Sequence, residues 1–109
     1  MYIYLDDERN IAGTTFDLVI CRNSTAAIRT LQIFHKCGEF DYLSLDHDLG
    51  KDELGHDDTG YKVVMFMAEN NIWPKNKPII HSANPVGRKN MESVIDRYGP
   101  YNNDYLGSD

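Results

Sequence analysis

Residues 42–48 of the chain, Tyr42-Leu43-Ser44-Leu45-Asp46-His47-Asp48, decide the fold. A short, mostly apolar run ends here in two carboxylates that flank an imidazole. Three further runs have the same form: residues 2–5 end in Asp6-Asp7, residues 17–21 in Arg22-Asn23, and residues 77–80 in His81-Ser82. Short apolar runs bounded by polar groups are typical of strands buried on both faces of a sheet. The sequence therefore predicts four short strands at these places.

The segments between the runs carry apolar residues at helical spacing, which predicts helices and hence βα units around a parallel sheet. Only about ten residues separate the first two strands, fewer than a helical crossover between parallel strands usually needs. Residues 8–16 therefore predict a loop or a single turn. The three expected helices begin at Ser24 or Thr25, at Asp58-Thr59 and at Asn84-Pro85, and they end near Gly38, before Pro74 and at Gly99-Pro100.

Composition predicts one globular domain over residues 1–109, with a core over residues 1–98 and a polar tail over residues 99–109. The chain has 109 residues, of which 41% are hydrophobic and 26% charged, as in ordinary globular proteins. Cys21 and Cys37 lack CxxC spacing and predict small core residues in a reducing compartment, with a lone disulfide as the alternative.

The formal net charge of -6 argues against sequence-independent binding to nucleic acid or to an anionic membrane, because both need a basic surface. A small phosphorylated ligand is still compatible with this charge, since local arginines or a metal ion can reverse its sign within a site. No apolar run approaches the roughly 18 residues that span a bilayer, and no secretory leader pattern is present. We therefore expect a soluble, cytoplasmic protein.

Polar side chains follow all four predicted strands, and the carboxyl ends of parallel strands meet at one edge, where ligands bind in open α/β sheets. Taken singly, each of these side chains has a structural interpretation, as a turn residue, a cap or a surface ion pair. Their convergence from four strand ends favours a functional site. The candidates are Asp6, Asp7, Arg9, Arg22, Asp46, His47, Asp48, His81, Ser82, Asn84 and Arg88.

Carboxylates gathered from two strand ends repel one another unless a cation or a proton lies between them. Asp6, Asp7 and Asp46 predict an oxygen-rich site suited to Mg²⁺, and an added ligand from His47 or His81 would favour Mn²⁺ or another transition metal. The remaining candidates predict phosphate contacts. One arginine can bind two phosphate oxygens at once, and small polar side chains can form further hydrogen bonds. These candidates are Arg9, Arg22, Ser82, Asn84 and Arg88.

Three strings at strand ends resemble a known family. Asp6-Asp7, Asp46 and Ser82 resemble the acidic pair, the phosphoacceptor and the small hydroxyl residue of response-regulator receiver domains. More closely, L-D-D-E-R (residues 5–9), S-L-D-H-D-L-G (residues 44–50) and I-H-S-A-N-P-V-G (residues 80–87) resemble the cyclic-phosphate processing receiver-like family. The resemblance covers residues 1 to about 98 and departs from receivers in two ways. The first helix is nearly missing, and no fifth strand carries the lysine that ordinary aspartyl-phosphate signalling uses.

The resemblance implies a small three-layer, flavodoxin-like α/β fold with a parallel sheet of about four strands, a reduced first helix and an open question over a fifth strand. It also implies an activity on cyclic phosphates of nucleotides or RNA ends. The leading hypothesis is a phosphoesterase in which His47 and His81 act as general base and general acid, in either order. Asp46 or Asp48 would orient one imidazole, and Asp6 and Asp7 would hold a divalent ion.

Two alternatives remain open at this stage. One is a non-catalytic module that binds a phosphate-containing ligand or a protein partner. The other is a phosphoacceptor switch at Asp46, for which the absent lysine is unfavourable.

Overall fold

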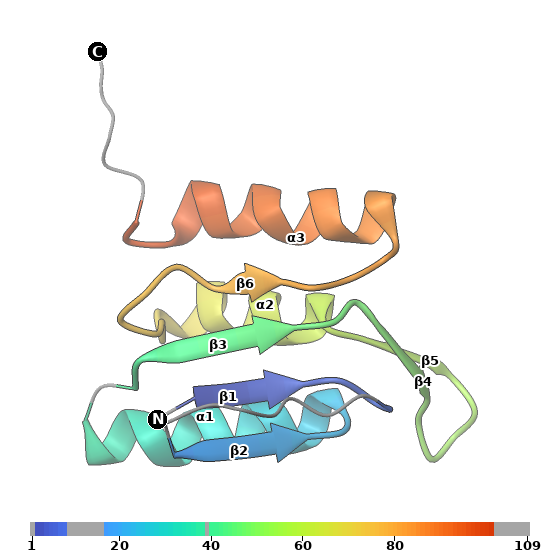
Figure 1. Ribbon diagram of the computed structural model, residues 1–109, viewed down its shortest axis with the longest axis horizontal. Helices are drawn as coiled ribbons and strands as arrows, with labels where there is room; N and C mark the ends of the chain where they lie inside the picture. Colours follow the sequence, from blue (N-terminus) through green and yellow to red (C-terminus); the bar gives the residue numbers. More distant parts are fainter. Residues whose placement is uncertain (1, 9–16, 39, 102–109) are drawn as a thin grey trace.

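A parallel four-stranded sheet forms the centre of the domain. The computed structural model describes residues 2–8, 17–38 and 40–101 (Figure 1). The strands β1 (Tyr2–Leu5), β2 (Leu18–Cys21), β3 (Tyr42–Leu45) and β6 (Ile79–Ile80) lie in the order β2-β1-β3-β6. This confirms the predicted receiver-like α/β sheet, with each strand within two residues of its expected bounds.

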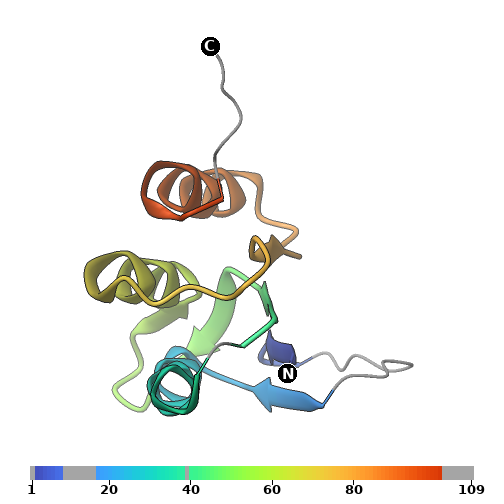
Figure 2. The same ribbon diagram turned by 90° about the vertical axis from the view of Figure 1, so that its left-hand side faces the viewer.

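All three helices lie on the same face of this sheet (Figures 1 and 2). They are α1 (Ser24–Cys37), α2 (Tyr61–Asn70) and α3 (Pro85–Tyr98), and α2 contacts both of the others. The described residues therefore supply two of the three expected layers. The turn expected at residues 8–16 falls outside the described residues except for its first position, and so does any fifth strand after residue 101.

The core lies between the sheet and the helices. Because side chains alternate along a strand, Ile3 and Leu5 of β1 face the helices and are fully buried. Leu43 and Leu45 of β3 do the same beside them. Burying one such side chain contributes about 1.5–3 kcal/mol. The helices cover this layer with side chains of the same kind, namely Leu31, Val63, Val64, Met67, Met91 and Ile95.

Two helices begin with asparagine caps. The Asn84 side chain accepts a hydrogen bond from the Gly87 N–H, and Pro85 occupies the first turn of α3, as predicted. The cap of helix α1 lies one residue earlier than predicted, because Asn23, rather than Ser24 or Thr25, accepts from the Ala26 N–H. An Asx cap is at least as favourable there as a serine or threonine cap.

The predicted cap of α2 at Asp58-Thr59 is wrong. Helix α2 begins at Tyr61 after Gly60, and no side chain caps it. The preceding residues instead form an antiparallel hairpin of β4 (Asp48–Lys51) and β5 (Asp57–Thr59), which the sequence analysis missed.

Asp58 ties this hairpin to α1. Its carboxylate accepts hydrogen bonds from the Ser24 N–H at 2.9 Å and from the Ser24 hydroxyl at 2.6 Å. The Lys62 ammonium lies 3.3 Å away. Burial opposes ionisation, but the hydrogen bonds from Ser24 and the charge of Lys62 outweigh it and hold the pKa of Asp58 below its ordinary value.

Of the two cysteines, Cys21 is buried and Cys37 is exposed, so the core prediction holds for Cys21 alone, and neither forms a disulfide. Within residues 2–8, 17–38 and 40–101, no helix combines the length and apolar character needed to cross a bilayer.

We expect Asp58→Ala to lower the free energy of unfolding at pH 7 by about 1–3 kcal/mol, because two donors of Ser24 lose their acceptor in a buried place. A lowered pKa contributes stability that is present above about pH 3.9, the ordinary value for aspartate, and that is lost as the pH falls through the folded-state value. The difference between wild type and variant should therefore shrink in acid. Urea unfolding followed by circular dichroism measures it.

The matched control is Asp57→Ala. Asp57 is the neighbouring carboxylate, and 78% of its side chain is exposed, so its loss should change stability by no more than about 0.5 kcal/mol. Equal effects of the two substitutions would contradict the role given to Asp58.

Candidate functional site

The hydrogen-bond ladder of the sheet continues one residue beyond β1, β3 and β6. The Asp6 N–H donates to the Cys21 carbonyl at 3.1 Å, and the Asp46 N–H donates to the Leu5 carbonyl at 2.9 Å. The His81 N–H donates to the Leu45 carbonyl, also at 2.9 Å. These bonds hold Asp6, Asp46 and His81 level with one another at the carboxyl edge.

The side chains of these three residues form one compact polar group. Their candidate ligand atoms all lie within 4.8 Å of one another. Asp6 is 1% exposed and Asp46 is 8% exposed, and the Asp6 Oδ2 atom lies 3.1 Å from Nε2 of His81. Two buried carboxylates beside an imidazole make a donor set that fits a divalent cation.

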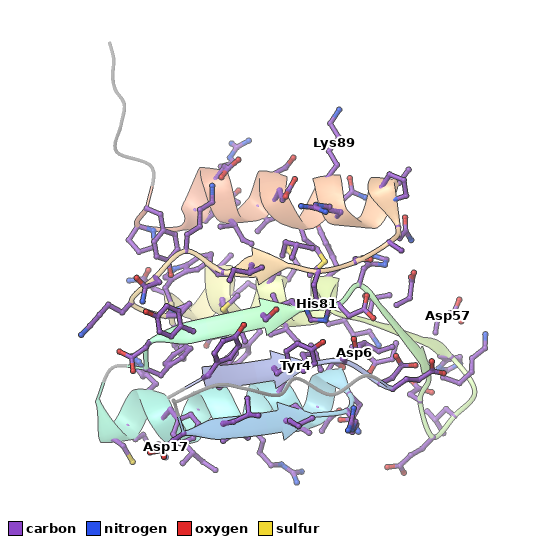
Figure 3. The ribbon with its side chains drawn as sticks, in the orientation of Figure 1. Tyr4, Asp6, Asp17, Asp57, His81 and Lys89 are labelled. Atoms are coloured by element: carbon purple, nitrogen blue, oxygen red, sulfur yellow. The ribbon has the colours of Figure 1, made fainter. Side chains whose placement is uncertain are left out.

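The His81 ring is held from two further sides. Its Nδ1 atom lies 2.7 Å from the Ser44 hydroxyl. The Tyr4 ring stacks on it with centroids 4.7 Å apart and planes 2° from parallel. Figure 3 shows Tyr4, Asp6 and His81 together at the carboxyl end of the strands.

His47 forms a second imidazole–carboxylate pair. Its Nδ1 atom lies 2.8 Å from Asp48 Oδ1, and this hydrogen bond is the largest cause of a lowered pKa of Asp48. The Asn84 amide also donates to Asp48, at 3.3 Å. Across the described parts of the chain, His47 Nε2 has no hydrogen-bond partner.

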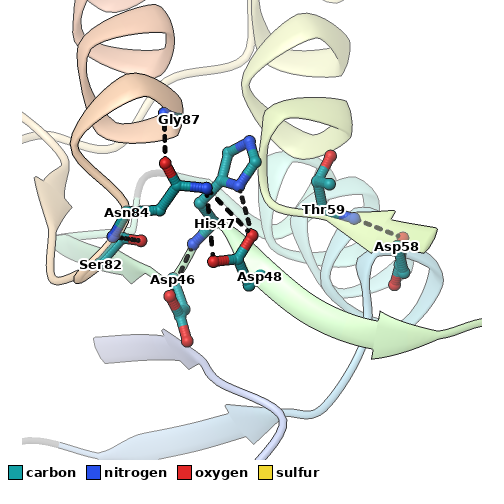
Figure 4. A network of polar contacts seen from close by, with 8 residues as sticks. All are labelled: Asp46, His47, Asp48, Asp58, Thr59, Ser82, Asn84 and Gly87. Carbon is teal, nitrogen blue, oxygen red and sulfur yellow. Dashed lines mark hydrogen bonds and ion pairs between the residues drawn. The ribbon is translucent and has the colours of Figure 1, made fainter.

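Asp46 connects the two pairs. The backbone N–H of His47 donates to Asp46 Oδ1 at 2.8 Å, while the His47 ring points to the other side of the chain, toward the start of α3 (Figure 4). A cavity of about 320 Å³ is lined by His47, Asp48 and the β4–β5 hairpin. One imidazole thus belongs to the buried acidic group, and the other faces an open cavity.

The start of α3 packs directly on His47. A Cβ atom on Gly87 would lie 2.4 Å from Cγ of the His47 ring, closer than real carbon atoms approach. Asn84 caps α3 through the Gly87 N–H and also contacts Asp48. Position and orientation of the His47 ring therefore depend on the first turn of α3.

Other predicted site residues lie around this edge without joining the compact group. Asp7 is half-buried and faces Gly50 of β4. Arg22 donates to the Asp6 carbonyl at 3.2 Å.

The buried Ser82 hydroxyl accepts from the Asn84 N–H, and the exposed Arg88 pairs with Glu92 of its own helix. Arg9 lies outside the described residues.

Ser44, Tyr4 and Gly87 were not among the predicted site residues. Two of them carried a signal. Ser44 is the one small polar residue in a strand that otherwise consists of leucine and tyrosine. A glycine inside a helix costs up to about 1 kcal/mol, which indicates a packing requirement.

The fold and the edge residues define a receiver-like α/β domain with an acidic edge. The family model of the cyclic-phosphate processing receiver domain matches residues 1–97. The chain belongs to this family. Comparison with curated proteins and with solved structures found no match.

We expect Gly87→Ala to destabilise the domain by about 1–3 kcal/mol, because the new methyl group overlaps the His47 ring. In a His47→Ala background, the same substitution should be neutral or stabilising, since alanine is the better helix former. Urea unfolding of the four proteins gives the coupling energy. A cost that persists without the ring would show that Gly87 is required for another reason.

Proposed function

We propose that the domain hydrolyses a cyclic phosphodiester on a nucleotide or at an RNA end. The observation that carries this proposal is the pair of imidazole–carboxylate contacts at one edge, His47 with Asp48 and His81 with Asp6. Proton transfer near neutral pH is the chemistry for which imidazole is best suited. The family description supports the cyclic phosphate as the group acted upon.

A divalent cation such as Mg²⁺ or Mn²⁺ would belong to this reaction. A phosphate approaching Asp6 and Asp46 meets two buried carboxylates in a chain of net charge -6, and a cation is needed to offset the repulsion. Asp6, Asp46 and His81 would hold it, and Asp7 follows Asp6 directly in the sequence. Such an ion supplies positive charge to the phosphate oxygens, where negative charge grows during attack.

His47 is the imidazole best placed to move a proton. With Nδ1 bonded to Asp48, the ring can keep its proton on that nitrogen and present Nε2 as a base to water. Water then adds to phosphorus as His47 removes its proton, one ester bond of the ring breaks, and the released sugar oxygen takes that proton from His47, so that the product has gained one water.

His81 has less freedom for the same role. Both of its ring nitrogens already have partners, Asp6 and Ser44. To donate to the leaving oxygen it would first have to release one of them. We therefore assign the proton transfer to His47.

Phosphate contacts in this proposal come from side chains that border the compact group. Arg22 lies against the backbone of Asp6, which puts a guanidinium beside the acidic edge. Ser82 and Asn84 lie between β6 and α3 and offer small polar groups. Arg88 would have to leave Glu92 to contribute, and Arg9 is a candidate from the sequence only.

The test is a screen of the purified protein against cyclic mononucleotides, cyclic dinucleotides and RNA ending in a 2′,3′-cyclic phosphate. Each reaction is run with EDTA, Mg²⁺ or Mn²⁺ and analysed by mass for the gain of one water. We expect a product that EDTA abolishes, and a rate that His47→Ala lowers by about 10²–10⁴-fold, as for loss of a general base.

His35→Ala is the matched control, because His35 is an exposed imidazole in the last turn of α1, at the opposite end of the helix from the sheet's carboxyl edge. It should keep the wild-type rate. Full activity in a His47→Ala, His81→Ala double variant would refute the mechanism. Saturable binding of a cyclic phosphate without any product would instead identify a non-catalytic binding module.

A further inference from the structure

We infer that His81 is a metal ligand through Nε2, together with Asp6 and Asp46, and that Ser44 positions it. The site would thereby select a divalent transition-metal ion such as Mn²⁺ over Mg²⁺. This inference deepens the proposed function and rests on it for the use of the ion, although binding of the ion can be measured by itself.

The spacing of the donor atoms fits a single ion. Two ligands bound at about 2.1 Å and at right angles lie about 3.0 Å apart. Asp6 Oδ2 and His81 Nε2 are 3.1 Å apart, and the group's three donor atoms all lie within 4.8 Å of one another. An ion can therefore replace the Asp6–His81 hydrogen bond with little movement of either side chain.

Ser44 gives His81 the outer partner that metal-binding histidines usually have. A ligating imidazole normally donates its other N–H to a fixed oxygen, which sets the tautomer and the ring orientation. The Ser44 hydroxyl lies 2.7 Å from Nδ1 of His81 and is almost fully buried. The Tyr4 ring, parallel at 4.7 Å, limits ring rotation further.

A hydroxyl also suits both states of the site, because it can donate or accept. Without an ion, the Nε2–H can bond Asp6 while the Ser44 hydroxyl donates to Nδ1. With an ion on Nε2, the proton lies on Nδ1 and Ser44 accepts it. An aliphatic side chain at this position could satisfy neither state.

The nitrogen ligand decides the class of ion. Mg²⁺ prefers oxygen ligands and keeps several waters, whereas imidazole suits transition metals. Two carboxylates and one imidazole therefore favour Mn²⁺ or a later divalent ion. His47, whose Nδ1 is held by Asp48, is not part of the donor group and serves as a comparison.

The experiment titrates MnCl₂ or MgCl₂ into the EDTA-treated full chain by calorimetry, and pulsed EPR then detects nitrogen coupled to bound Mn²⁺. We expect Mn²⁺ to bind at least about tenfold more tightly than Mg²⁺. His81→Gln should remove the nitrogen coupling and weaken Mn²⁺ by about 100-fold or more, and Ser44→Ala should weaken it by about 10–100-fold. Binding of Mg²⁺ should change much less in Ser44→Ala.

The matched control is His47→Gln, which should keep both the nitrogen coupling and the Mn²⁺ affinity. Circular dichroism checks that each variant is folded. Bound Mn²⁺ without nitrogen coupling in the wild type, or unchanged affinity in His81→Gln, would overturn the inference. Nitrogen-coupled Mn²⁺ in a protein that hydrolyses no cyclic phosphate would support it and refute the proposed function.

Discussion

Three backbone hydrogen bonds beyond the strand ends determine which side chains meet at the carboxyl edge of the sheet. They continue the ladder to Asp6, Asp46 and His81, so that three side chains far apart in sequence lie level and nearly buried at one edge. Burying two carboxylates in such a place is costly unless charge or hydrogen bonds compensate. The His81 imidazole bonds the Asp6 carboxylate, and the Ser44 hydroxyl and the stacked ring of Tyr4 hold that imidazole in place. The packing of the sheet thus buries two carboxylates, and other groups of the site have to compensate their negative charge.

A second set of contacts supports this edge from outside. The hairpin of β4 and β5 follows β3 immediately and is held on α1 through Asp58 and Ser24. It forms one wall of the cavity at His47. The positions of His47 and Asp48 therefore depend together on β3, on the β4–β5 hairpin and on the start of α3.

Much of this could be predicted from the sequence, and the limits have physical causes. Strand positions and the convergence of Asp6, Asp46 and His81 followed from short apolar runs and from the parallel arrangement, since level strand ends bring their successors together. The cap of α2 failed because Asp58 finds better donors in Ser24, a partner distant in sequence. The separate surroundings of His47 and His81 were not predicted either, because they depend on the β4–β5 hairpin and on the packing of α3 against the His47 ring, and local sequence patterns showed neither.

The contact between Gly87 and the His47 ring has a consequence for how such a chain can change over time. A side chain at position 87 is excluded while an imidazole occupies position 47. Asn84 must meanwhile serve both the cap of α3 and the carboxylate of Asp48. A substitution at position 47, 84 or 87 is therefore expected to depend on the residues at the other two positions. In related chains that have lost the imidazole, we expect a larger residue at position 87. The residues at positions 47 and 87 would then indicate from sequence alone whether the His47–Asp48 part of the edge is present.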